Sequence, residues 1–209
     1  MPRHISVINR LAMVVGAIWL VGLVMAVQPA AQSAETIRYT DTGELIKPPD
    51  FREWIFVSAG LGMNYNPQGA GAANPSRPPA FTNVFVNPSS YRAFLRTGAW
   101  PDKTMFVLEI RGSSSEGSIN KAGRFQSDVM AIEAEVKDST RPDMWAYYDF
   151  GATADRARPL PKSAACYECH STKAAVEQTF VQFYPTLMDI ARRQKTVNPT
   201  YSDAPAARP

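Results

Sequence analysis

The five-residue run Cys166-Tyr167-Glu168-Cys169-His170 constrains this chain more than any other stretch of it. A C-x-x-C-H run is the attachment signature of a c-type haem. On a helical turn, residues three apart lie on one face, so both thiols can reach the same edge of one porphyrin. The histidine that follows is held beneath the ring, where it can ligate iron. The run therefore predicts one covalently attached haem c, with Cys166 and Cys169 as thioether residues and His170 as the iron ligand.

These two cysteines are the only ones in the sequence, which limits how else they could be used. A thioredoxin-like pair would need a βαβ pattern, and none is visible before Cys166. A structural zinc site needs four ligands, whereas this run supplies two cysteines and one histidine. A plain disulfide or a redox-active pair is the alternative that the sequence leaves open.

The N-terminal segment has the three parts of a secretory signal peptide. Arg3 and Arg10 give it a positive start, residues 11–27 form an uninterrupted apolar run, and small residues follow up to Ser33. We expect cleavage after Ser33, which removes residues 1–33 and places the remainder in the periplasm. The alternative is an uncleaved membrane anchor, since the apolar run is long for a signal peptide and short for a spanning helix.

Net charge and histidine content exclude two classes of function. The whole chain carries a net charge of +3, and residues 1–33 contain two arginines and no acidic residue, which leaves +1 for the remainder. We therefore expect no nucleic-acid partner, because such binding depends on clustered positive charge. Without His4, His170 is the single remaining histidine. A bis-histidine electron-transfer cytochrome is thereby excluded.

The main part of the chain, residues 34–195, has the pattern of an α+β fold: an antiparallel β-sheet with a few helices, the haem-binding helix being C-terminal. Residues 196–209 are rich in proline and alanine and predict a disordered tail. Strands are expected where β-branched and aromatic residues cluster or alternate with polar ones. These segments are residues 82–86, 104–111, 128–137 and 144–150, preceded by residues 51–57, which are expected to form a strand or a short helix-to-strand segment.

Alternation assigns faces within two of these strands. Phe106, Leu108 and Ile110 share one face of the segment 104–111. In the segment 128–137, Glu133 and Glu135 share a face. The opposite face of that segment carries Met130, Ile132, Ala134 and Val136.

Capping residues and breakers predict the helices and loops. Asn87-Pro88 predicts a helix over residues 89–97 that ends at Gly98 and places Tyr91, Phe94 and Leu95 on one face. The glycines and prolines of residues 59–80 predict a loop. Beyond His170, apolar residues recur at helical spacing, interrupted by Pro185. They are Ala174, Ala175, Val176, Thr179, Phe180, Phe183 and Leu187.

Several motifs together resemble those of the cytochrome P460 family and its relatives, the beta-type cytochromes c-prime. Besides the C-x-x-C-H run, they are Phe51-Arg52-Glu53-Trp54, Val84-Phe85-Val86-Asn87-Pro88 with Tyr91, residues 98–104, 132–138 and 145–148, and Thr179-Phe180-Val181-Gln182-Phe183-Tyr184-Pro185-Thr186-Leu187. The resemblance spans nearly all of residues 34–195. It implies a mainly antiparallel sheet with helices, a haem in a pocket and a homodimer.

The resemblance carries roles to particular residues. Cys166, Cys169 and His170 match the haem-attaching and iron-ligating positions, and Glu133 matches an acidic residue beside the distal pocket. The enzymes of the family bear a lysine that cross-links to the porphyrin, and its position here is Leu108, which has no amine. Their distal arginine corresponds to Thr82. Both departures remove polar groups from the distal side.

Three functions remain open on these residues. An apolar distal side around Leu108 and Phe106 would leave the sixth iron position open and favour nitric oxide or carbon monoxide, in scavenging, sensing or detoxification. A second possibility is an oxidoreductase that acts on hydroxylamine, nitric oxide or peroxide with Glu133 as proton acceptor and an unidentified redox partner. The third is an electron carrier with a methionine as sixth ligand. The candidates are Met63, Met105, Met130, Met144 and Met188.

Overall fold

A five-stranded antiparallel sheet forms the centre of the fold. The computed structural model describes residues 35–63 and 78–202, and the predicted signal segment and residues 64–77 lie outside the described residues. Strands follow one another in the order of the chain, β2-β3-β4-β5-β6, and every neighbouring pair is antiparallel. Their bounds are β2 Ile55–Leu61, β3 Phe81–Val86, β4 Met105–Ser114, β5 Phe125–Lys137 and β6 Trp145–Asp149. The predicted α+β class is confirmed.

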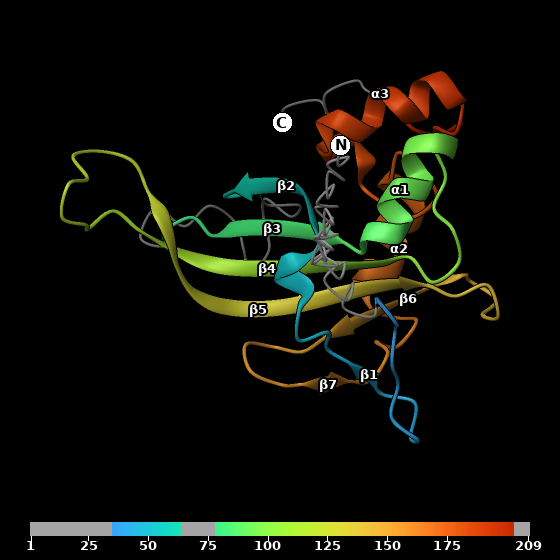
Figure 1. Cartoon of the computed structure of the whole chain (residues 1–209), viewed down its shortest axis with the longest axis horizontal. Coiled ribbons are helices and arrows are strands. Elements are labelled where there is room, and N and C mark those ends of the chain that lie inside the picture. Colours follow the sequence, from blue (N-terminus) through green and yellow to red (C-terminus); the bar gives the residue numbers. More distant parts are fainter. Residues whose placement is uncertain (1–34, 64–77, 203–209) are drawn as a thin grey trace, which may run out of the picture. The chain divides into compact units, whose positions relative to one another are not determined.

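Three α-helices and a small second sheet complete the fold. The helices are α1 Pro88–Thr97, α2 Ala165–Lys173 and α3 Pro185–Gln194, with 3-10 turns at η1 Phe51–Glu53 and η2 Val181–Phe183. Strands β1 Leu45–Ile46 and β7 Arg156–Ala157 pair antiparallel. Figure 1 shows the helices gathered at one end of the main sheet. At the opposite end, the β4–β5 hairpin extends past β2 and β3. No helix in the described ranges is long and apolar enough to cross a membrane.

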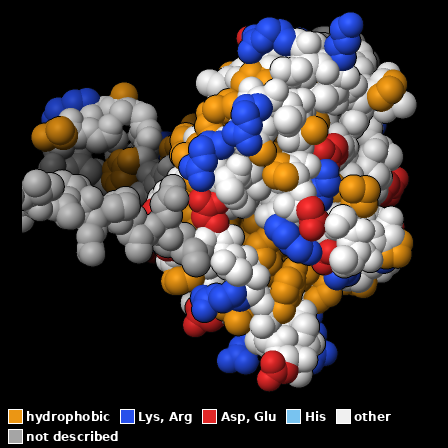
Figure 2. All heavy atoms as spheres, turned by 45° about the vertical axis from the view of Figure 1, so that its right-hand side comes forward, with side chains coloured by type: hydrophobic (Ala, Val, Ile, Leu, Met, Phe, Trp, Pro, Cys, Tyr) orange, Lys and Arg blue, Asp and Glu red, His pale blue; other side chains and the backbone are white. Residues whose placement is uncertain are grey.

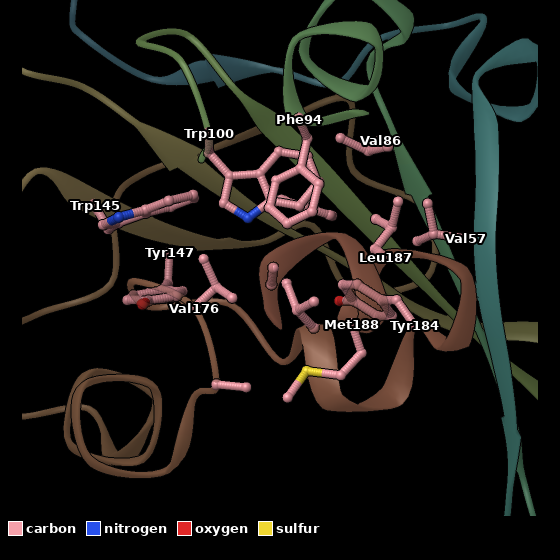
Figure 3. Close-up of a cluster of buried hydrophobic side chains, with 14 residues drawn as sticks. Val57, Val86, Phe94, Trp100, Trp145, Tyr147, Val176, Tyr184, Leu187 and Met188 are labelled. Carbon is pink, nitrogen blue, oxygen red and sulfur yellow. The ribbon is translucent and has the colours of Figure 1, made fainter. Parts of the chain in front are cut away.

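The two faces of the main sheet bury different clusters of side chains. Phe106 belongs to the cluster under α1 and α3, whereas its neighbours Met105 and Val107 belong to the cluster on the opposite face. The predicted alternation along β4 is therefore confirmed. In the first cluster, Trp100 stacks on Phe94 with a centroid distance of 4.0 Å, as Figure 3 shows. This packing fixes α1 against the end of the sheet.

Helix α1 begins and ends where the sequence predicts, but two details differ. The side chain of Asn87 does not cap the helix; its Oδ1 accepts a hydrogen bond from the amide of Met105 and so ties the helix start to β4. Of the three residues on the predicted face, Phe94 is buried in the first cluster and Tyr91 packs partly buried against it. Leu95 lies outside the cluster and is 42% exposed. Gly98 ends the helix with a φ of 69°, where a side chain would collide with Gln194 of α3.

The expected loop over residues 59–80 begins too early. Strand β2 continues through Leu61, because Ala59, Gly60 and Leu61 pair with Asn83, Thr82 and Phe81 of β3. Strand β4 likewise runs on to Ser114. Glycine has a low intrinsic preference for strands, which is why the sequence predicts a loop here. Pairing with a neighbouring strand overrides that preference.

A bulge in the β4–β5 pair changes one predicted face. The pairing shifts between Ile110 and Arg111, which leaves Met130 out of register and 49% exposed. Ile132, Ala134 and Val136 remain buried on the face that the sequence predicts. A single extra residue in one strand is enough to turn a side chain away from the core.

Most of the apolar stripe after His170 is buried, although Phe183 is 39% exposed, and the stripe does not form one continuous helix. Helix α2 ends at Lys173, an irregular segment covers residues 174–180, and Pro185 begins α3. Glu177 has a φ of 51°, a left-handed conformation that ends any right-handed helix. Residues 196–202 also differ from the expected disordered tail, since Val197 and Tyr201 pack against the first cluster. The boundary at residue 196 therefore falls too early.

Candidate haem site

A cavity of about 330 Å³ lies between the sheet, α2 and the residues around η2. Apolar and aromatic side chains make up most of its wall, together with two carboxylates and the C-x-x-C-H residues. The lining residues are Ser58, Gly60, Met63, Thr82, Val84, Phe106, Leu108, Glu133, Ala134, Glu135, Tyr147, Tyr148, Leu160, Ala165, Cys166, Cys169, His170, Phe180, Phe183 and Tyr184.

All of the site residues predicted from the sequence line this one cavity. Helix α2 contributes Cys166, Cys169 and His170, strand β4 contributes Phe106 and Leu108, and β5 contributes Glu133. In the sheet register, Leu108 pairs with Glu133, and Phe106 pairs with Glu135. Alternate residues of two paired strands therefore form a continuous wall facing α2.

Helix α2 is held only weakly by the protein itself. It has nine residues, none of them buried, and no side chain caps its N-terminus. A helix of this length is marginal in water without tertiary packing. Its cavity-facing residues would gain that packing from a flat apolar group between α2 and the sheet, which is what a porphyrin supplies.

The two cysteines lack the features of a redox-active pair. Both are free thiols, and burial raises the pKa of each, with the charge of Glu133 adding to the effect at Cys166. Redox-active thiols have a lowered pKa, because the thiolate is the nucleophile. The raised pKa of both thiols therefore argues against thiol exchange as the role of this pair.

His170 is positioned through one ring nitrogen. Its Nδ1 lies 2.7 Å from the main-chain oxygen of Gln178 and 3.0 Å from Oε2 of Glu135. The ring packs between Tyr147 and Phe180, with centroid distances of 4.5 and 4.3 Å. Since both acceptors lie at Nδ1, that nitrogen carries the proton, and Nε2 is the nitrogen left to ligate a metal.

The charges around His170 and Glu133 shift both groups. Burial alone lowers the pKa of His170, but the negative charge of Glu135 and the hydrogen bond to the carbonyl of Gln178 outweigh it, so the pKa is raised overall. Burial also raises the pKa of Glu133, and the charge of Asp149 adds to this effect. Glu133 is thus a carboxyl that takes up a proton more readily than an exposed one.

Glu135 is the site residue that sequence reasoning missed. The alternation of side chains along this strand placed Glu135 on the same face as Glu133, and this was the one sequence feature that could have indicated that Glu135 belongs to the site. Its contact with His170 joins β5 to α2 across 35 residues of chain, and local patterns do not reveal such a contact. Gln178 was missed for the same reason, because only its main-chain oxygen meets His170.

The wall around Leu108 carries no cationic side chain. Among the described residues that line the cavity there is no lysine or arginine, and Thr82 and Leu108 both face it. Val107 belongs to the opposite cluster, and Glu109 is buried beside Arg52 with which it is hydrogen-bonded. The predicted orientation of this strand, with Leu108 toward the site, therefore agrees with the structure.

One methionine reaches the cavity. Met63 lines it, whereas Met105 and Met188 are buried in the two core clusters and Met130 and Met144 are exposed. Of the five candidates for a sixth ligand, only Met63 is placed near the site in the part of the chain that the structure describes.

Together these features define a haem-binding site of the c-type cytochrome kind: an apolar slot, a C-x-x-C-H helix along it and a histidine with Nδ1 engaged. The model of the cytochrome P460 family matches residues 48–181, which include all of β2 to α2. The chain belongs to the cytochrome P460 family and is a haem-binding cytochrome. No curated protein matches the chain.

Proposed function

We propose that this protein is an exported mono-haem c-type cytochrome that binds a small diatomic gas, nitric oxide or carbon monoxide, at an open iron position. Cys166 and Cys169 would hold the haem by thioether bonds, and Nε2 of His170 would ligate the iron. When bound, the haem supplies the iron that takes the gas. The protein's part is to hold the haem, provide one axial ligand and line the other side with apolar groups.

The observation that carries this proposal is the composition of the wall around Leu108. Phe106, Val84 and Leu108 bring hydrocarbon surface to the cavity, and no lysine, arginine or second histidine lies among its described lining residues. The three side chains supply no iron ligand, and the described lining supplies no cationic hydrogen-bond donor. Neutral gases therefore bind without the desolvation cost that charged ligands would incur.

The optical spectrum of the ferrous protein, matured in an exporting host, tests this proposal. We expect a high-spin spectrum that shifts when carbon monoxide is added. A low-spin spectrum that is indifferent to carbon monoxide would instead mean that a protein side chain occupies the sixth position. N-terminal sequencing of the mature protein tests the predicted cleavage after Ser33.

A second candidate function is oxidation of hydroxylamine or nitric oxide, or a peroxidase-like reaction, and the position of Glu133 favours it. This carboxyl lines the cavity, and burial raises its pKa, which suits a proton acceptor for a polar substrate. The electrons would leave to a redox partner. Steady-state turnover with hydroxylamine and an artificial electron acceptor tests this function. Glu133→Gln should abolish turnover without removing the haem.

We also propose that the protein is a homodimer. On the sheet face opposite the cavity, Phe56 and Leu61 of β2 are 54% and 52% exposed. On the face seen in Figure 2, hydrophobic side chains are likewise exposed between charged ones. Apolar surface of this kind is favourable to bury between two copies. Light scattering of the wild type and of Phe56→Glu tests this, because a charge on this face should yield monomers.

A further inference from the structure

We propose that the ion pair between Lys137 and Glu177 is a positioning device for His170. It would determine that the Nδ1 proton is donated to the neutral carbonyl of Gln178 and not to the carboxylate of Glu135. This inference rests on the proposed ligation of iron by His170. It concerns residues that do not line the cavity themselves.

Glu177 is held at both its side chain and its main chain. Its Oε2 accepts a hydrogen bond from Nζ of Lys137 at 2.6 Å, and its Oε1 accepts one from the amide of Trp100 at 3.0 Å. Asn198 accepts a hydrogen bond from the amide of Glu177 and donates one to its carbonyl. These contacts maintain the left-handed backbone of Glu177, a conformation that a non-glycine residue rarely adopts unaided.

The ion pair is largely shielded from solvent. The Lys137 side chain is 10% exposed and that of Glu177 is 25% exposed, and Lys137 also donates to the carbonyl of Trp100 at 2.6 Å. Removing one member of such a pair leaves the other charge buried without its partner. Without Lys137, the carboxylate of Glu177 would turn toward water, and Glu177 would keep only its main-chain contacts with Asn198.

The backbone at Glu177 directly sets the next residue, Gln178. The carbonyl of Gln178 lies 2.7 Å from Nδ1 of His170. Its side chain is fixed as well, because Tyr147 donates to Oε1 at 3.0 Å and Nε2 donates to the carbonyl of Asp143 at 3.2 Å. If the backbone of Glu177 relaxed, a small rotation of the following peptide, between Gln178 and Thr179, would move the Gln178 carbonyl out of line with the Nδ1 proton.

A second acceptor is ready to take that proton. Oε2 of Glu135 lies 3.0 Å from Nδ1, yet it accepts no hydrogen bond in the described structure, because the N–H points to Gln178. A carboxylate acceptor draws the Nδ1 proton more strongly than a carbonyl does and makes the imidazole a stronger donor to a metal. The ion pair thus selects between a weaker and a stronger axial ligand.

The test compares Lys137→Met with the wild-type holoprotein by resonance Raman spectroscopy of the ferrous state and by redox titration. We expect the iron–histidine stretching band to shift to higher wavenumber and the midpoint potential to fall in Lys137→Met. Lys137→Arg, which keeps the cation, should restore both values toward those of the wild type. Glu177→Gln, which keeps an acceptor for the amide of Trp100, should produce the same shifts as Lys137→Met. It replaces Lys137→Met in the test if that variant fails to fold.

Two further variants separate positioning from a general loss of stability. Adding Glu135→Gln to Lys137→Met removes the competing carboxylate, so the shifts should disappear in the double variant. Lys47→Met, which removes a lysine paired with Asp155 away from the cavity, should leave the band and the potential unchanged.

Three results would overturn the proposal. These are an unchanged band in folded Lys137→Met and Glu177→Gln, shifts that persist in the double variant, or equal shifts in Lys47→Met. The failure of the proposed function is distinguishable, because a wild-type protein without any iron–histidine band would refute ligation by His170 itself, and this inference with it.

Discussion

Leu108 of β4 lies directly opposite Glu133 of β5 in the sheet register, and both side chains face the same cavity. An apolar group and a carboxyl are thus neighbours on the wall that would face a bound gas. The resemblance places a lysine at the position of Leu108 in enzymes of the cytochrome P460 family. The gas-binding proposal therefore depends on Leu108, and the enzymatic proposal depends on its neighbour Glu133.

Introducing an amide at Leu108 should change which gas is favoured. Leu108→Gln places a hydrogen-bond donor in the cavity, and a hydrogen bond to polar bound dioxygen contributes about 1.4 kcal/mol, roughly tenfold in affinity. Carbon monoxide, which accepts hydrogen bonds poorly, should change much less. Ligand-binding titrations of the ferrous protein measure both affinities.

The control for this variant is Ile110→Gln, on the same face of β4 but outside the cavity lining. It should leave both affinities close to those of the wild type. An equal effect of the two variants, or none in Leu108→Gln, would contradict the placement of Leu108 beside the bound gas.

Replacing the cysteines should convert covalent haem into extractable haem. In Cys166→Ser with Cys169→Ser, we expect acidified organic solvent to remove the haem, while each single variant should retain one thioether bond. Helix α2 has no buried residue of its own, so the double variant should also lower the melting temperature of the holoprotein. Covalent haem persisting in the double variant would refute the assigned attachment.

The buried carboxyl of Glu133 should make stability depend on pH. Burial raises its pKa, so its contribution to folding is fully present below the ordinary carboxyl pKa and is lost as pH rises through the raised value. Glu133→Gln should therefore match the wild type in acid and be more stable than it at neutral and alkaline pH. Thermal unfolding of the apoprotein from pH 4 to pH 8 measures this difference.

Glu116→Gln is the matched control, because Glu116 is an exposed loop residue. Its stability should follow that of the wild type at every pH. A Glu133→Gln variant that tracked the wild type equally closely would show that the carboxyl is not destabilised by its surroundings.

Met63 distinguishes an open iron position from an electron carrier. It is the described methionine that lines the cavity, and a thioether on iron would give a low-spin spectrum. Under the gas-binding proposal, Met63→Leu should leave the ferrous spectrum and the affinity for carbon monoxide within about threefold of the wild type, since an isosteric apolar exchange costs little. A change from low spin to high spin in this variant would identify Met63 as the sixth ligand.

Local sequence patterns predicted those parts of the fold that depend on local preference. Alternation gave the correct faces of Phe106, Leu108 and Glu133, and Asn87-Pro88 located the start of α1. The C-x-x-C-H run predicted three residues that the structure places in the cavity lining, because the expected chemistry requires a fixed spacing. Each of these signals is contained within a few residues of chain.

What the sequence did not reveal depends on contacts between distant segments. Gly60 lies in a strand because β3 pairs with it, and Met130 is exposed because a bulge shifts its pairing. The apolar residues after Lys173 have helical spacing, yet Glu177 is held in a left-handed conformation by Lys137, Trp100 and Asn198. No local pattern encodes those partners.

Addition of carbon monoxide to the ferrous holoprotein, followed by optical spectroscopy, tests the central claim most directly. The account predicts a high-spin spectrum before addition and a shifted low-spin spectrum after it, since His170 would supply one axial ligand and Leu108, Phe106 and Val84 would supply none. A low-spin ferrous spectrum that does not respond to carbon monoxide would contradict it.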